Sequence, residues 1–351
     1  MTSARHLQLL AVALLALAPP AQAQGSKSAL VELAAYAGAD REQRLMEGAR
    51  REGTLNLYTS LPVDDITELN NAFEKRTGIK VRTWRASSEK VVQRAVAEAR
   101  AGRSEVDIVE CGAVALEILH REGLLQTVRS PHHADLMPAA VPAHREWVGA
   151  RLNVFVHAYN TRLVRKEELP ASYTDLLHPR WKGRLGIEAS DEDWFAGVVR
   201  SMGEEKGLKL FRDIVAANGM SVRRGHSLLA NLVVSGEIPF ALTVYSFTAE
   251  QLKQKGAPLD WYVMSPAIAR ANGVAVARRA QKPHAALLYY DFMIGEEGQR
   301  ILLKRDFVPA SRKLETPLNH GPLTIVDAAL LVDQGERWAK LYEETIVKQS
   351  R

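Results

Sequence analysis

The chain has 351 residues, of which 46 are basic and 41 acidic, giving a formal net charge of +5 at neutral pH. The basic residues are spread among acidic ones instead of forming a patch, so the charge pattern does not favour nucleic-acid binding. The single cysteine, Cys111, excludes an internal disulfide, so a conventional hydrophobic core has to stabilise the chain.

The first 23 residues have the pattern of a cleavable signal peptide. Arg5 precedes an apolar run from Leu7 to Leu17, and the small-residue site Ala21-Gln22-Ala23 follows, with cleavage predicted after Ala23. Position 24 is Gln and not Cys, which argues against a lipid anchor. We therefore predict a protein secreted to the periplasm that is soluble and monomeric.

From Asp40 onward, short strands and helices alternate with little spacer between them. A helix is expected after Asp40, ending at Gly53, and further helices are expected before Gly78 and after Ser87-Ser88. The expected strands cover residues 54–58, 79–84 and 106–109. Parallel strands need crossover helices, so this alternation predicts a parallel α/β sheet.

A second α/β run begins near Val154, after a connecting stretch that contains three prolines between residues 131 and 142. Its expected strands are 184–187, a short one at 222, 240–244 and 261–263, and its expected helices are 194–202, 208–217 and 228–235. A further strand at 273–276 and a helix after Pro283 follow. The pattern predicts two lobes with a hinge.

In open parallel sheets, ligands bind beyond the carboxyl ends of the strands. The residues at these ends are mostly hydroxyl-bearing or glycine, which together with helix-start amides suits an oxyanion. The candidates from the first lobe are Tyr58, Thr59, Ser60, Ser88 and Gly112, and those from the second are Ser190, Asp191, Trp194, Arg224, Ser227 and Tyr245.

Each candidate also has a purely structural interpretation. The serines are preferred helix caps, and an arginine such as Arg224 is usually solvated. Asp191 has a favourable place at the positive end of the helix that begins near Trp194, and Trp194 itself suits a core position. These alternatives stay open at the level of sequence.

The motifs G-x-S-x-G, H-E-x-x-H, G-x-x-x-x-G-K-[ST] and G-x-G-x-x-G are all missing from the sequence. We therefore predict binding without turnover and no cofactor. The alternative from another class is a secreted α/β hydrolase that uses Ser190 or Ser227 with His226.

Several segments, in order, resemble family 1 extracellular solute-binding proteins of the ferric-iron-type branch. They are residues 53–60 (GTLNLYTS), 72–81 (AFEKRTGIKV), 106–109 (VDIV), 158–161 (AYNT), 179–183 (PRWKG), 235–237 (SGE) and 298–299 (GQ). The resemblance implies a type II periplasmic-binding-protein fold, with two mainly parallel sheets flanked by helices and a ligand cleft between the lobes. It also implies an ABC permease in the inner membrane as partner.

From this resemblance, residues 24–150 are expected to form the first part of lobe 1, and residues 151–267 form lobe 2. Residues 268–318 return to lobe 1, and residues 319–351 form C-terminal helices that pack on lobe 2. The expected function is capture of a small anionic solute or an iron chelate by lobe closure, for import.

Ferric members of the family hold iron with adjacent tyrosines near the position of Tyr245, together with a histidine, a glutamate and an anion. This chain has Tyr245-Ser246 in place of a tyrosine pair. A true ferric-ion-binding protein that uses Tyr245 as its metal ligand is therefore the alternative, and a sensory role in place of transport is another.

Overall fold

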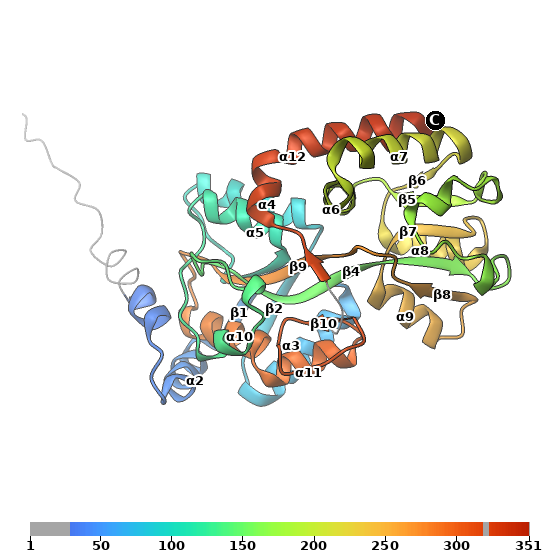
Figure 1. The fold of residues 1–351 in the computed structure, drawn as a ribbon. Coiled ribbons are helices and arrows are strands. Elements are labelled where there is room, and N and C mark those ends of the chain that lie inside the picture. The colour runs from blue at the N-terminus through green and yellow to red at the C-terminus, as the bar shows by residue number, and fades with distance from the viewer. Residues whose placement is uncertain (1–28, 319–322, 351) are drawn as a thin grey trace, which may run out of the picture.

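Two lobes are joined by long strands in the computed structural model, which describes residues 29–318 and 323–350 (Figure 1). The predicted signal peptide, residues 1–23, lies outside the described part of the chain. Strands β4 (Val148–Asn160) and β9 (Ala267–Val276) pass from one lobe to the other and pair antiparallel. Within the described residues, no helix is long and apolar enough to cross a membrane.

The first lobe has the parallel sheet that the sequence predicts. Strand β1 (Thr54–Thr59) lies between β2 (Lys80–Arg85) and β3 (Ile108–Gly112), and β9 pairs antiparallel with β3. The helices of this lobe are α2 (Arg41–Glu52), α3 (Val63–Thr77), α4 (Ser88–Arg100), α5 (Ala113–Arg121), α10 (Pro283–Ile294) and α11 (Glu296–Lys304). Gly53 and Gly78, with φ of 70° and 79°, end α2 and α3 in the left-handed conformation that suits glycine.

The second lobe repeats this plan with fewer strands. Strand β5 (Leu185–Glu188) is parallel to β6 (Ser221–Arg223) and β7 (Phe240–Tyr245), while β8 (Leu259–Tyr262) and β7 pair antiparallel with β4. Its helices are α6 (Glu192–Met202), α7 (Glu204–Asn218), α8 (His226–Ser235) and α9 (Ser246–Gln254). Two short strands, β10 (Val308–Pro309) and β11 (Leu323–Ile325), pair with β4 and β9.

The sequence pattern predicts that this segment begins near Val154. Strand β4 instead begins six residues earlier, at Val148, and all 13 of its residues are buried. Arg151 and Asn153 interrupt its apolar pattern, although both are buried and Arg151 pairs with Glu110. The same strand contributes to both lobes. The apolar core therefore runs through both lobes instead of forming one separate core in each.

The two clusters of buried apolar side chains show this continuity. One contains Leu57 of the first lobe and Phe240 of the second, and the other contains Val109 and Ala241. Cys111 lies in β3 with no exposed surface, and burial raises the pKa of its thiol well above the usual range. The free thiol therefore serves as a small core residue.

The C-terminal helix α12 (Ala328–Tyr342) lies across the two lobes on one side of the molecule (Figure 1). It packs against α5 in the first lobe and against α6 in the second, and the short helical segment after it, Glu343–Val347, packs on α7. The sequence-based expectation placed these C-terminal helices on the second lobe. Contact with α5 adds a link to the first lobe.

Candidate ligand site between the lobes

A cavity of about 280 Å³ lies at the carboxyl ends of the parallel strands and is lined by both lobes. The first lobe contributes Ser60, Pro62, Arg85, Ser88 and Gly112, and the second contributes Gly225, His226, Ser227, Tyr245, Phe247 and Thr248. Residues Arg151, Asn153, Arg270 and Asn272 of β4 and β9 line it between them. The cavity is therefore placed where relative movement of the lobes changes its size.

Five helices begin at this cavity, and the N-cap or first residue of each lines it. They are α3 (Pro62), α4 (Ser88), α5 (Gly112), α8 (Gly225) and α9 (Tyr245). The first turn of each helix leaves backbone N–H groups without intrahelical partners, and the helix dipole places partial positive charge there. Convergence of five such ends makes the cavity favourable for an anion.

Arg85 is a first-lobe arginine whose charge is not neutralised by a described carboxylate. Its Nε donates to the carbonyl of Leu61 at 3.3 Å, and the guanidinium is exposed and forms no ion pair with any described residue. Arg151, in contrast, is held by Glu110 at 2.9 Å, with 2% and 0% of the two side chains exposed. Arg85 therefore offers positive charge to a ligand, whereas Arg151 is largely neutralised within the protein.

Glu110 organises the first-lobe side of the cavity. Its Oε2 accepts from the Thr59 hydroxyl at 2.5 Å and from the Leu61 backbone N–H at 3.2 Å, while its Oε1 binds Arg151. One buried carboxylate thus fixes the loop after β1 to the end of β3 and to β4.

On the second-lobe side, Arg270 lies between two carboxylates. Its Nη2 donates to Asp191 Oδ1 at 2.9 Å, and its Nε lies 2.9 Å from Asp193 Oδ2. His226 Nε2 is 3.3 Å from the same Asp191 oxygen. Burial would lower the pKa of His226, but the Asp191 carboxylate more than offsets this and raises the pKa above its ordinary value of 6.5. The Asp191 carboxylate thus stabilises the protonated imidazole relative to a free histidine.

Tyr245 provides an aromatic wall next to this charged group. Its ring lies 3.9 Å from the His226 ring and 5.2 Å from that of Phe155, centroid to centroid, and stacks with Phe247 at 5.8 Å. Burial raises the pKa of the Tyr245 hydroxyl, so it is a neutral donor in this environment. Tyr245 therefore adds an aromatic ring and a neutral phenol to the lining of the cavity.

Glu188 ties the two ligand-side loops of the second lobe together. Its carboxylate accepts from the backbone N–H of Gly225 at 2.8 Å and from that of Ser190. The loop after β5 and the loop after β6 are thereby held next to each other. This arrangement parallels the role of Glu110 in the first lobe.

The sequence candidates fall into three groups in the structure. Ser60, Ser88, Gly112, Ser227 and Tyr245 line the cavity. Asp191, Ser190 and Arg224 lie behind or beside it, with Asp191 bound to Arg270 and His226, and with the Ser190 hydroxyl accepting from Arg224 at 3.4 Å. Tyr58, Thr59 and Trp194 have buried side chains that face other parts of the protein.

The last group has clear structural roles. The Tyr58 hydroxyl donates to Glu98 at 2.7 Å, and Thr59 donates to Glu110. Trp194 is 1% exposed and packs edge-on against Tyr173 and Phe211. The Ser88 hydroxyl accepts from the Gly112 N–H at 3.1 Å, so this candidate also joins two helix starts.

Sequence reasoning missed the arginines and asparagines of the cavity. Arg85, Arg151, Arg270 and Asn272 lie within strands, where charged residues usually mark the solvent-facing side. Strands β4 and β9 are buried along most of their length, which makes polar residues in them unusual. A polar residue within an otherwise buried strand is therefore the signal that could have identified the cavity residues of β4 and β9.

Two groups of possible metal ligands occur in the described residues. Glu188, Asp191 and His226 offer ligand atoms within 4.8 Å of one another beside the cavity. Their oxygens already accept from backbone amides and from Arg270, whose guanidinium disfavours a further cation at this point.

The other group, Glu117, His120 and His144, lies outside the cavity. The two imidazoles are stacked with centroids 3.7 Å apart and planes 11° apart, and His144 Nδ1 accepts from the Glu146 backbone N–H. Parallel rings do not direct their in-plane lone pairs at one ion. This group therefore has the geometry of a half-buried, hydrogen-bonded cluster.

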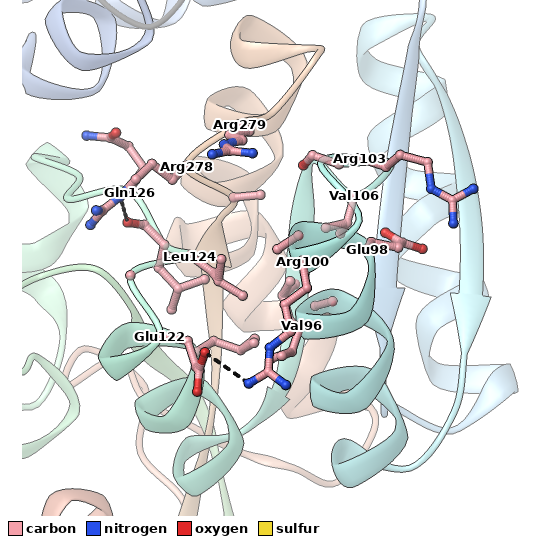
Figure 2. A pocket seen from close by; sticks show the side chains of 18 of the residues that line it. Val96, Glu98, Arg100, Arg103, Val106, Glu122, Leu124, Gln126, Arg278 and Arg279 are labelled. Carbon is pink, nitrogen blue, oxygen red and sulfur yellow. Dashed lines mark hydrogen bonds and ion pairs between the residues drawn. The ribbon is translucent and has the colours of Figure 1, made fainter.

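A larger cavity of about 690 Å³ lies in the first lobe between α4 and the loop after α5 (Figure 2). Val96 and Leu124 stand on its opposite walls, and Arg100 pairs with Glu122 at 3.9 Å. Helices α4 and α5 present their carboxyl ends here, where the dipole is negative. This cavity is lined by one lobe alone, so it is a weaker candidate for ligand capture.

Comparison with known proteins gives a consistent family. The family model described as bacterial extracellular solute-binding protein matches residues 107–325. The chain is 25% identical over 273 residues to iron uptake protein A1 of Synechocystis sp., covering 72% of this chain and 74% of that protein.

Solved structures share the fold. Iron-bound HitA from Pseudomonas aeruginosa superposes with a TM-score of 0.72 at 22% identity, covering 83% of this chain and 99% of that one. The periplasmic binding protein AfuA from Actinobacillus pleuropneumoniae, with fructose-6-phosphate bound, gives a TM-score of 0.72 at 21% identity over 84% and 99%.

Proposed function

Because the chain belongs to the bacterial extracellular solute-binding protein family, we propose that it captures a small anionic solute or an iron chelate between its lobes. It then delivers this ligand to an ABC permease in the inner membrane. The proposal includes secretion to the periplasm with cleavage after Ala23, the monomeric state and binding without turnover. AfuA, which has this fold, is described with a sugar phosphate bound, and iron uptake protein A1 is named for iron.

The observation that carries the proposal is the convergence of five helix starts on a cavity that also contains the unpaired Arg85. Backbone N–H groups from both lobes can bind the same anion only when the lobes are close together. An anion therefore favours the closed form, which is the requirement for capture by closure.

The proposed contacts follow the geometry. Ser60, Ser88, Gly112 and Arg85 would bind the ligand from the first lobe. Ser227, His226 and Tyr245 would bind it from the second, with Asp191 holding the imidazole in place. Ser190 and Arg224 form a pair at the rim, within reach of a larger ligand.

Titration calorimetry with inorganic phosphate, citrate, fructose-6-phosphate and ferric citrate tests the proposal. Arg85→Gln should weaken binding of the best ligand about tenfold or more, since a charge-assisted hydrogen bond is lost. Arg82→Gln is the matched control, because Arg82 lies on the same strand, is exposed and does not line the cavity. Equal effects of the two substitutions, or heat from none of the four probes, would contradict it.

A ferric-ion-binding protein is the second candidate, favoured by the Tyr245 phenol in the lining of the cavity. Ferric ion supplied as its nitrilotriacetate complex should then give a visible phenolate-to-iron absorption band that Tyr245→Phe abolishes. A band that persists in the variant, or no band at all, speaks against direct iron ligation by this residue.

The hydrolase alternative gains no support from the geometry. The ring nitrogens of His226 face the Thr243 carbonyl at 3.2 Å and Asp191 at 3.3 Å, and neither has Ser227 or Ser190 as a partner. A general base has to be within hydrogen-bond reach of the hydroxyl that it activates. We accordingly place His226 in ligand binding.

A further inference from the structure

Helix α12 has its two ends fixed to different lobes. Its first half packs against α5, where Ala328 and Leu331 are 6% exposed, and its second half packs against α6, where Trp338 and Tyr342 are 1% and 2% exposed. Figure 1 shows the helix running from one lobe to the other, apart from the strands β4 and β9 that join them. It is therefore a third link between the lobes.

The link to the first lobe combines the small buried contact of Ala328 and Leu331 with a partly exposed ion pair. Arg121 of α5 pairs with Asp333 through Nη1 and donates from Nη2 to the Ala329 carbonyl at 3.1 Å. The side chains of Arg121 and Asp333 are 38% and 61% exposed. An ion pair with this exposure breaks and re-forms at little cost and weakens in salt.

The link to the second lobe is buried and leads to the ligand loops. The Tyr342 hydroxyl donates to the backbone carbonyl of Glu188, and its ring packs edge-on against Phe195 at 5.4 Å. The carboxylate of the same Glu188 holds the Ser190 and Gly225 amides. This end of α12 therefore contacts Glu188, the residue that holds the two second-lobe loops beside the cavity.

We propose that α12 is a brace that sets the opening of the cleft, moving with the second lobe and released from the first through the Arg121–Asp333 contact. When the lobes rotate about β4 and β9, one end of a rigid helix fixed to both has to slide. The first-lobe end, with one exposed ion pair and two smaller apolar side chains, gives way more readily than the end that buries Trp338 and Tyr342. Arg121 and Asp333 are then positioning residues that favour the arrangement described here, in which both lobes line one cavity.

Small-angle X-ray scattering of the ligand-free protein tests the brace without any ligand. The proposal rests on the proposed function only for the use of closure, so a failure to bind anions would leave this measurement interpretable. Asp333→Asn should raise the radius of gyration, because loss of an exposed ion pair shifts the ratio of open to closed forms by up to about fivefold. Raising sodium chloride should move the wild type toward the variant.

The matched control is Arg337→Gln. Arg337 is on the same helix and pairs with Glu204 of α7, so this exposed ion pair stays within the second lobe. Arg337→Gln should therefore leave the radius of gyration unchanged. Arg121→Gln, which also removes the bond to Ala329, should act at least as strongly as Asp333→Asn.

A radius of gyration that is unchanged or smaller in both Asp333→Asn and Arg121→Gln would overturn the proposal. So would an equal increase in Arg337→Gln, since that would trace the effect to α12 stability and not to the link between lobes. Thermal unfolding of each variant confirms that the compared proteins are folded.

Discussion

Buried ionisable side chains hold the cleft in shape at the level of single residues. Glu110 and Glu188 each lie at the end of a parallel strand and accept backbone N–H groups from a neighbouring loop. A carboxylate with several such bonds is fixed in orientation, and so are the loops that it binds. The cleft is therefore preformed by charges that do not themselves line it.

The first prediction concerns the Glu110–Arg151 pair. Glu110→Gln leaves Arg151 buried without its counter-charge, so the free energy of unfolding should fall by about 3 kcal/mol or more. Urea unfolding measures the loss. Asp213→Asn, which breaks the exposed pair of Asp213 with Lys209, serves as control and should cost no more than about 0.5 kcal/mol. Similar losses in both variants would contradict the assigned importance of burial.

The second prediction is a pH dependence of stability through His226. Its pKa is raised in the folded state, so the stabilisation from its pairing with Asp191 is fully present below 6.5, the ordinary value. This stabilisation is lost as the pH rises through the raised pKa. The difference in unfolding free energy between the wild type and His226→Gln should therefore shrink from pH 6 to pH 9. A difference that is constant or grows with pH would show that the imidazole is not paired in this way.

The residues that sequence reasoning found share a local signal. Ser60, Ser88 and Ser227 stand at strand-to-helix junctions, where the change of period and a capping residue are visible in the sequence. The position of Arg85 and Arg270 at the cavity depends on how the strands pair, which is a non-local property that the sequence pattern does not reveal. The aromatic Trp194 shows the converse case, since a helix-start tryptophan suits a ligand site or a core equally well until its neighbours are known.

Among the elements, the strands that cross between the lobes were the hardest to delimit. Strand β4 contains Gly149, Arg151 and Asn153 before its apolar half, and these residues resemble a loop when no partner strand is known. Pairing with β9 on one side and the ion pair to Glu110 supply the missing stabilisation. The parallel strands and their helices, in contrast, follow from local periodicity and from the glycines that end the helices.

The third prediction compares two glycines in different elements. A Cβ at Gly273 of β9 would lie 2.3 Å from the Val148 carbonyl oxygen of β4, so Gly273→Ala forces the crossing strands apart. We expect a loss of about 1–3 kcal/mol in unfolding free energy. Gly335 of α12 has no neighbour within 4 Å of the same position, so Gly335→Ala should stabilise by up to about 1 kcal/mol through helix propensity. Thermal and urea unfolding measure the stability of both variants. An unchanged stability of Gly273→Ala would show that β4 and β9 can accommodate a methyl group at this position.

Across the whole molecule, the two lobes share their strands and their core. Strands β4 and β9 belong to both, and each apolar cluster contains residues of both. Neither lobe is a continuous segment of chain, because α10 and α11 return to the first lobe after β9, and the end of α12 then packs on the second. The lobes therefore form one unit in folding while they remain two bodies in ligand capture.

The fourth prediction follows from this shared core. Urea unfolding should give one transition, with the same midpoint for tryptophan fluorescence and far-ultraviolet circular dichroism. Both lobes contain reporters, since Trp147 packs in the first and Trp181 in the second. Two separated transitions, or different midpoints for the two probes, would mean that one lobe unfolds independently.

The sealed position of the lone thiol has a practical consequence. Because Cys111 is inaccessible and its thiolate is disfavoured, maleimide dyes should leave the native protein unlabelled. A cysteine introduced at the exposed Ser227, at the mouth of the cavity, would then take up a single environment-sensitive fluorophore without removal of the natural one. The protein is in this respect already suited to conversion into an optical biosensor, which would allow whole metabolite collections to be screened by emission.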